Sequence, residues 1–163
     1  MLGLTRNQAY YAAVIVETVA AAKLPERAAH IALEVALTES ALRMYANGHQ
    51  PASLRLPHDA VGWDHGSVGL FQQQVGGAPN STADWGTVAE LMDAATSARK
   101  FLAALEKLPW RGPNTTNWHT SQQIQGSSFA DASNYRRNDT RAIEIGHTLW
   151  TVHRATIITA GRA

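Results

Sequence analysis

The chain of 163 residues contains no cysteine, which excludes disulfide bonds and thiolate-bound metals. It also has no strong charge of either sign, because its 14 lysine and arginine residues nearly balance its 13 aspartate and glutamate residues. The positive side chains are scattered, whereas a nucleic-acid-binding domain usually gathers them in one patch. We therefore expect no nucleic acid among its partners.

Long hydrophobic runs are absent as well. A membrane-spanning helix needs about 20 consecutive apolar residues, and the apolar stretch near the amino terminus, at 12–22, is interrupted by Glu17. The start of the chain also lacks the layout of a signal peptide. The sequence thus predicts no membrane insertion and no export signal of its own.

The residues that are present are typical of a globular domain. Hydrophobic residues make up 45% of the sequence and charged residues 17%, a balance that separates folded domains from disordered segments. No internal repeat or heptad pattern is visible. We expect one domain over residues 1–163, which is long enough to bury its own core. This domain could also be one part of a longer protein.

Helical patterns dominate the chain. The Thr5–Gln8 capping box leads into a predicted helix over 9–22. A second helix is predicted over 25–46, from a proline that suits a helix start to a stop at Asn47-Gly48. Further helices are predicted at 87–92, 94–107, 118–125 and 140–158. Asp93 is expected to cap the helix over 94–107 and Asn117 the helix over 118–125. Asn138 and Asp139 together are expected to cap the last helix.

Between these helices the pattern changes. Residues 47–66 form a long loop rich in glycine, proline and aspartate, and loops of this length in a compact domain are often functional. Residues 67–74 predict a short extended or irregular segment, followed by a loop over 76–81. Residues 127–135 are expected to form a turn with at most one short helix. The predicted fold is therefore mainly α, with a small irregular or β region near residues 60–75.

Glu39 stands near the end of the second predicted helix, and two interpretations of it are open. In the first it is an exposed acid paired with Arg43, which stabilises a helix only slightly. In the second, the apolar neighbours Val35, Leu37 and Ala41 place it near a buried stripe. Burial disfavours the charged form of a carboxyl and raises its pKa, as a general acid requires near neutral pH.

Neither a paired acid on the same helix face nor a metal site is indicated. Glu34 precedes Glu39 by about 140° around the helix, so the two acids do not share a face. Two histidines, His58 and His65, lie near aspartates in the long loop. Their spacing matches no familiar metal motif. We therefore expect no metal and no cofactor.

Two short motifs carry a resemblance to a known superfamily. The sequence reads ESALR at 39–43 and, after the long loop, GSVGLFQQ at 66–73. A Glu-Ser pair at a helix end, followed by such a Gly-Leu-Phe-Gln segment, resembles the lytic transglycosylase and goose-type lysozyme superfamily. The likeness is greatest to wall-hydrolase domains of actinobacteria and their phages.

This resemblance implies a lysozyme-like fold and a peptidoglycan-cleaving glycosidase. Such enzymes cut the β-1,4 bond between N-acetylmuramic acid and N-acetylglucosamine, and Glu39 matches their general acid. In a lytic transglycosylase that acid protonates the leaving oxygen and then deprotonates the muramoyl 6-hydroxyl, which closes a 1,6-anhydro ring. In an inverting muramidase a second carboxylate activates a water instead.

Asp64 is the main candidate for a second carboxylate. Gly62-Trp63-Asp64 resembles a Gly-Trp-x-Asp element of goose-type lysozymes, with slightly shifted spacing. An inverting hydrolase needs its base about 6.5–9.5 Å from the acid, whereas a transglycosylase needs none. Equally, Asp64 could be a turn residue that bonds its own backbone. The choice between transglycosylase and hydrolase is open on these grounds.

Several side chains are expected to contact the sugars. Gln72 offers a donor and an acceptor that suit an acetamido or hydroxyl group, and Trp63 is expected to line the cleft because sugars stack on exposed rings. The Ala-Tyr-Asn segment that the superfamily carries later is absent, and Gln125 to Phe129, followed by Asp131 and Tyr135, is expected to stand in its place. The predicted substrate-binding residues are Ser67, Gln72, Trp63, Gln125 and Tyr135.

The resemblance also sets expectations about context. It implies a monomer whose partner is the glycan strand of peptidoglycan. Without an export signal, the protein would reach the cell wall by holin-type release, by virion delivery or as part of a larger protein with added wall-binding or peptidase domains. Two other classes are open. One is a catalytically inactive glycan- or wall-binding module of a phage or wall-associated assembly, and the other is a helical interaction domain that neither binds nor cleaves glycans.

Overall fold

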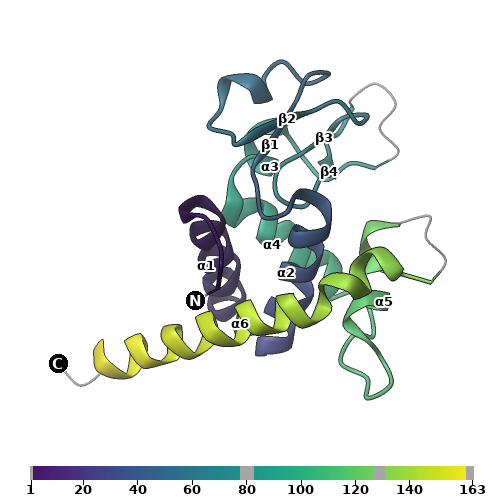
Figure 1. Ribbon diagram of the computed structural model, residues 1–163. Helices are drawn as coiled ribbons and strands as arrows, with labels where there is room; N and C mark the ends of the chain where they lie inside the picture. Colours follow the sequence, from purple (N-terminus) through teal and green to yellow (C-terminus); the bar gives the residue numbers. More distant parts are fainter. Residues whose placement is uncertain (1, 78–82, 127–130, 161–163) are drawn as a thin grey trace.

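The structure, a computed structural model, describes residues 2–77, 83–126 and 131–160, without the side chains of 157–160. Helices make up most of these residues, and short strands gather at one end (Figure 1). The prediction of a mainly α fold with a small β region is therefore confirmed. The predicted loop over 76–81 and the turn over 127–135 lie partly outside the described residues.

The first two helices begin where local signals place them. In helix α1 (Arg6–Ala21), the side chains and amides of Thr5 and Gln8 form the reciprocal bonds of a capping box. Helix α2 (Glu26–Ser40) follows Pro25. The buried residues of α1 recur at helical spacing along one face: Ala12, Ile15, Val16, Thr18 and Val19.

Helix α2 is the central element of the molecule (Figure 1). It packs against α1 and against α4 (Ala94–Leu105), α5 (Asn117–Gln125) and α6 (Ser133–Ala160). Its buried residues are Ala28, Ala29, Ile31, Ala32, Leu33, Glu34, Val35, Ala36 and Ser40. A helix that is apolar on most sides belongs in the interior, and its many alanines let neighbouring helices approach closely. The position of α2 therefore determines where the other helices lie.

The predicted end of the second helix is wrong, because α2 ends at Ser40 rather than near Ala46. Ala41 and Leu42 both take a left-handed backbone, with φ of 53° and 55°. The amide of Leu42 bonds back to the carbonyl of Ala36 at 3.0 Å, as in a Schellman stop. Leu42 is fully buried, and this burial offsets the backbone strain of a stop that lacks glycine.

The residues after α2 build a β region where the sequence predicted a continued helix and then a long loop. Strand β1 (Tyr45–Asn47) pairs in parallel with β2 (Ala60–Gly62), and the 3-10 helix η1 (Ser53–Arg55) lies between them in the chain. Strand β3 (Ser67–Val68) pairs antiparallel with β4 (Gln73–Gln74). The predicted extended segment is thus confirmed as a short hairpin.

The contacts of Asn47 explain why the predicted stop of the second helix at Asn47-Gly48 was wrong. Its side chain is buried at the end of β1, and its Nδ2 donates to the carbonyls of Asp64 and Ser67 at 3.0 and 2.9 Å. Its Oδ1 accepts a bond from the amide of His49. An asparagine that would end a helix in isolation therefore ties β1 to the segment that leads into β3.

The turn between β3 and β4 packs directly on α3 (Val88–Leu91). Gly69 in this turn has φ of 79°, and a Cβ there would lie 2.2 Å from the carbonyl oxygen of Leu91. Only glycine fits such a position. Helix α4 follows α3 and is capped as predicted, since the carboxylate of Asp93 accepts the amide of Thr96 at 2.8 Å.

The start of the last helix was also predicted wrongly. Helix α6 begins at Ser133 rather than at 140 and continues without a break to Ala160. Asn138 and Asp139 lie inside it and do not cap it. Asn138 donates to Thr38 of α2, and Asp139 accepts a bond from α5. Both side chains therefore bind neighbouring helices in place of their own backbone.

Helix α5 shows the same effect at its start. Thr116 is the cap, because its hydroxyl accepts the amide of His119. Asn117, the predicted cap, bridges two helices instead: its Oδ1 accepts from Arg27 Nε at 3.0 Å and its Nδ2 donates to Asp139 at 2.9 Å. Charged partners on α2 and α6 bind this amide more strongly than a backbone amide would.

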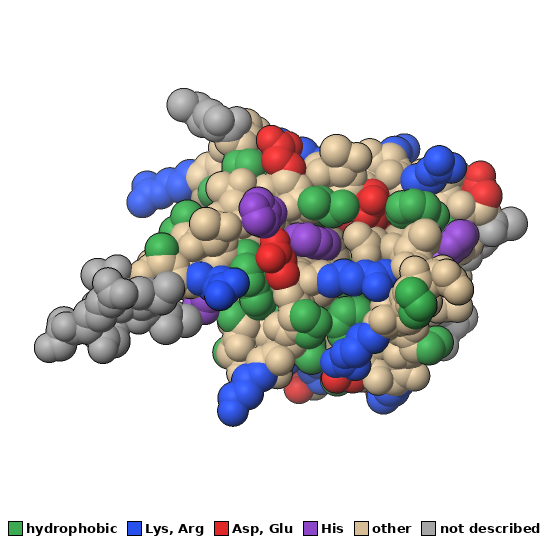
Figure 2. All heavy atoms as spheres, turned by 90° about the horizontal axis from the view of Figure 1, so that it is seen from below, with side chains coloured by type: hydrophobic (Ala, Val, Ile, Leu, Met, Phe, Trp, Pro, Cys, Tyr) green, Lys and Arg blue, Asp and Glu red, His purple; other side chains and the backbone are tan. Residues whose placement is uncertain are grey.

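Helix α6 crosses one face of the helical body, and its carboxyl-terminal half projects beyond α1 (Figure 1). On the face seen in Figure 2, basic, acidic and histidine side chains are interspersed and do not gather by kind. This distribution agrees with the scattered lysines and arginines of the sequence. Within the described ranges, no helix has the length and apolar character needed to cross a membrane.

Candidate active site

Glu39 is the penultimate residue of α2 and lies half-buried at a pocket of about 260 Å³. The pocket is lined by the end of α2 and the start of α6: Thr38, Glu39, Ser133, Asn134 and Arg137. Arg43, the partner in the exposed-pair interpretation, instead lies over the ring of Tyr45 and donates to its hydroxyl. Because α2 ends before Arg43, the helical spacing that would pair it with Glu39 is lost.

Tyr135 brings α6 into direct contact with Glu39. Its ring is 1% exposed, and its hydroxyl donates to Glu39 Oε1 at 2.6 Å. Burial has the largest influence on Glu39 and raises its pKa, the Tyr135 hydrogen bond lowers it, and the charge of Asp64 raises it. The pKa is raised on balance. This carboxyl therefore keeps its proton to a higher pH than an exposed glutamate and can donate it into the pocket.

Two hydrogen bonds attach the 67–74 segment to the helices around the pocket. The hydroxyl of Ser40, in the last turn of α2, lies 2.7 Å from the carbonyl oxygen of Leu70. Gln125, at the end of α5, donates from Nε2 to the carbonyl of Phe71 at 2.8 Å. The structure therefore brings the two sequence motifs and Gln125 together.

Gln72 and Ser67 belong to the same segment but make local contacts. Gln72 has φ of 48°, and its Nε2 donates to the carbonyl of Gly69 at 3.0 Å, so its amide closes the β3–β4 turn. Ser67 is 7% exposed and lies in β3. Their contacts with sugars stay predictions. The bond to Gly69 uses one N–H of the Gln72 amide, which has a second N–H and a carbonyl oxygen.

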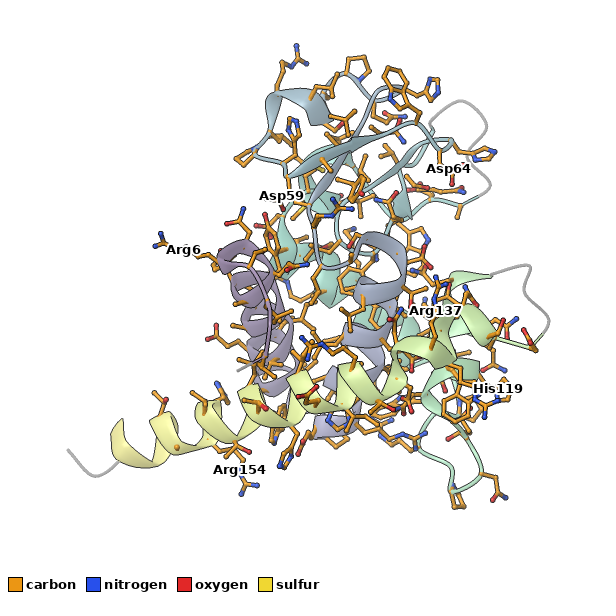
Figure 3. All side chains as sticks on the ribbon, in the orientation of Figure 1. Arg6, Asp59, Asp64, His119, Arg137 and Arg154 are labelled. Atoms are coloured by element: carbon orange, nitrogen blue, oxygen red, sulfur yellow. The ribbon has the colours of Figure 1, made fainter. Side chains whose placement is uncertain are left out.

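Asp64 lies in the β region, and Figure 3 shows it above the end of α2, with Arg137 on α6 below. Its side chain is 81% exposed, and Oδ1 lies 2.6 Å from Nδ1 of His65. Its negative charge raises the pKa of Glu39. Asp64 is thus electrostatically coupled to the candidate acid, and its role as a base stays a prediction.

Trp63 is an exposed aromatic ring held in place from one side. It is 67% exposed and packs on Gly48, where a Cβ would lie 2.2 Å from the indole. Its ring also meets His49 edge-to-face, with centroids 5.6 Å apart. Such a ring can stack on a sugar. Since it is not part of the lining of the Glu39 pocket, a glycan would have to extend beyond that pocket to reach it.

The sequence interpretation missed Glu34. This side chain is 0% exposed, and the hydroxyl of Ser121 on α5 donates to its Oε1 at 2.6 Å. Burial raises its pKa to about 8, against the effect of the Ser121 bond and together with that of Asp139 on α6. The sequence feature that could have indicated its burial is its position between Leu33 and Val35, inside an otherwise apolar stretch. Glu34 thus joins the three helices that surround the site.

The histidines of the long loop make contacts with near neighbours in the chain. His65 binds Asp64, and Nδ1 of His58 lies 2.7 Å from the carbonyl oxygen of Leu56. Among residues 2–77, 83–126 and 131–160, no group of three or more histidine, aspartate or glutamate side chains could hold a metal ion.

No protein-family model matches the chain, and no curated protein matches it either. The site has a half-buried carboxyl with a raised pKa, a buried tyrosine hydroxyl bonded to that carboxyl, and a pocket beside them.

We expect Tyr135→Phe to raise the pKa of Glu39 further, because the hydroxyl that stabilises the charged carboxylate is lost. The free energy of unfolding should fall by about 1 kcal/mol. An NMR titration of the Glu39 side chain measures the pKa, and chemical denaturation measures the stability. Tyr10→Phe, at an exposed tyrosine of α1, should change neither quantity. An unchanged or lowered pKa in Tyr135→Phe would contradict the assigned role of the hydroxyl.

Proposed function

We propose that this protein cleaves the β-1,4 bond between N-acetylmuramic acid and N-acetylglucosamine in peptidoglycan, as a lytic transglycosylase or a lysozyme-type muramidase. The observation that carries the proposal is the raised pKa of Glu39 beside an open pocket, with the Tyr135 hydroxyl bonded to its carboxyl. The bond from Ser40 to Leu70, which joins the Glu-Ser pair to the Gly-Leu-Phe-Gln segment, supports it. The resemblance of both motifs to the transglycosylase superfamily supports it as well.

In the first step Glu39 acts as the general acid. Its proton passes to the glycosidic oxygen while the bond between that oxygen and C1 of the muramoyl sugar breaks, and the N-acetylglucosamine leaves with a new hydroxyl. Positive charge develops at C1, and the carboxylate left on Glu39 keeps the hydrogen bond from Tyr135. The negative charge of Asp64 favours the same positively charged state.

The attack on C1 has two chemical routes: in one it follows departure of the leaving group, and in the other it accompanies it. In the transglycosylase route the muramoyl 6-hydroxyl attacks C1, and its proton passes to the Glu39 carboxylate, which yields a 1,6-anhydro end. In the inverting route a water attacks C1 in concert with departure of the leaving group, and Asp64 takes its proton, which yields a reducing end. Glu39 serves as acid in both, so the products and not the acid distinguish the routes.

Purified cell walls provide the test. We expect the protein to sediment with walls in a pulldown and to lower their turbidity, and mass spectrometry of the released fragments should show anhydro or reducing muramoyl ends. Binding without clearing would indicate an inactive wall-binding module and contradict the enzyme. Absence of both would remove peptidoglycan as the ligand. We propose that this activity serves phage lysis, virion entry or a larger wall enzyme.

A further inference from the structure

Arg137 is the positively charged side chain in the lining of the Glu39 pocket. It lies on α6 one turn after Ser133, which lines the same pocket, so the two side chains share a helix face. Figure 3 shows Arg137 beside the end of α2, where Glu39 is located. The side chain is exposed, so a ligand in the pocket can reach it.

The guanidinium of Arg137 makes no hydrogen bond or ion pair within the part of the chain that the structure describes. Its neighbours on α6 differ, because Arg136 lies over the ring of Trp118 at 5.6 Å and Arg141 pairs with Glu144 at 2.9 Å. The burial that raises the pKa of Glu39 also disfavours a carboxylate beside Arg137. A free guanidinium is well suited to a carboxylate, which it binds with two parallel hydrogen bonds.

The amino-terminal end of α6 does not supply this positive charge. Asp131 already occupies that end, since its Oδ1 accepts the amide of Ser133 at 3.1 Å. An anion that enters the pocket would therefore meet the side chain of Arg137 and not free backbone amides. Anion binding in this pocket would therefore depend on Arg137, and not on the general preference of helix amino termini for negative charge.

We infer that Arg137 is a specificity-determining residue that binds a carboxylate carried by the muramoyl sugar, and that it favours peptidoglycan over neutral polymers of N-acetylglucosamine. The inference rests on the proposed function. The carboxylate can belong to the lactyl ether of the sugar or to the attached peptide, and both offer the same chemistry to a guanidinium. A chito-oligosaccharide offers neither.

The experiment measures binding to the full chain by titration calorimetry, in a Glu39→Gln background so that no ligand is cleaved. Three tetrasaccharides are compared: chitotetraose, a muramoyl tetrasaccharide with free lactyl carboxylates, and the same glycan with its peptides attached. We expect Arg137→Gln to weaken binding of a carboxylate-bearing ligand about tenfold and to leave chitotetraose unchanged. The ligand that responds identifies which carboxylate is bound. Arg137→Lys should keep part of the affinity, because the charge remains while the paired geometry is lost.

Arg154→Gln is the matched control, at an exposed arginine on the distal half of the same helix (Figure 3), and should change no affinity. Equal weakening for all three ligands would overturn the inference, and so would unchanged affinity for all three. Either result would leave the proposed cleavage standing, because wall clearing by the wild-type protein is measured separately. Failure of every glycan to bind would overturn the inference and the proposed function together.

Discussion

Glu39→Gln is expected to lower the rate of wall clearing at least about a hundredfold, because general acid catalysis contributes factors of roughly 10² to 10⁴. A glutamine amide matches the carboxyl in size but cannot deliver a proton to the glycosidic oxygen near neutral pH. Its carbonyl oxygen can still accept the hydroxyl of Tyr135, which lies 2.6 Å from the present carboxylate oxygen. Activity should therefore fall while wall binding in a pulldown is preserved.

Stability should not account for the loss. The raised pKa of Glu39 shows that its surroundings favour the neutral carboxyl, so a neutral amide adds no desolvation cost and Tm should not fall. Glu17→Gln makes the same chemical change at an exposed position of α1 and should clear walls at the wild-type rate. Clearing by Glu39→Gln at a rate near wild type would rule out Glu39 as the acid and remove the main support of the proposed function.

Glu34→Gln is expected to remove a large pH dependence of stability. The pKa of Glu34 is about 8 in the folded protein, against an ordinary value of 4.5. Below pH 4.5 both the folded and the unfolded chain hold the proton. Between pH 4.5 and about 8 the unfolded chain releases it and the folded chain keeps it, so the free energy of unfolding falls as pH rises and the loss is complete above about 8. At about 1.4 kcal/mol per pKa unit, this loss is roughly 5 kcal/mol.

A glutamine at position 34 keeps the contacts and removes the titration. Its carbonyl oxygen can accept the hydroxyl of Ser121, now 2.6 Å from Glu34, and its amide can donate to Asp139. The three helices around the site would stay joined without an ionisable group in their interior. The variant should therefore be more stable than wild type at alkaline pH, because a buried carboxylate is more costly than a buried amide that is hydrogen-bonded.

Urea denaturation at about pH 5, 7 and 9 measures this difference. The free energy of unfolding of the wild type should decline over this range, and that of Glu34→Gln should decline much less. Glu17→Gln changes an exposed acid and should follow the wild type. Parallel curves for the wild type and Glu34→Gln would contradict a neutral buried acid at this position.

Signals between residues close in the chain predicted the fold class and much of the helix order. The Thr5–Gln8 capping box and the Asp93 cap act over three residues, and both are present in the structure. Burial periodicity placed α4 and most of α2 correctly. These features depend on local geometry alone, so a sequence contains all that is needed to recognise them.

Polar residues near predicted helix ends gave wrong caps and stops where their side chains bind residues that are distant in sequence. Asn47, Asn117 and Asn138 all have side chains that favour caps and stops. In the structure Asn47 binds the carbonyls at and before the start of β3, Asn117 binds two neighbouring helices, and Asn138 binds α2. Helix α2 ends at Ser40 because Leu42 is buried, and no pattern among nearby residues predicts that burial. Tertiary contacts outweigh cap preferences because each preference is worth only about 1 kcal/mol.

The sequence by itself determined a mainly helical domain, because helical periodicity is a relation between residues close in the chain. It also contained the two motifs that make Glu39 the candidate acid. Only the tertiary structure decided the surroundings of that acid. It placed the Tyr135 hydroxyl on the Glu39 carboxyl, joined Ser40 to Leu70, buried Glu34, and left Arg137 exposed in the pocket. The physical reason is that burial, charge and hydrogen bonding set a pKa, and folding supplies all three from parts of the chain that are far apart in sequence.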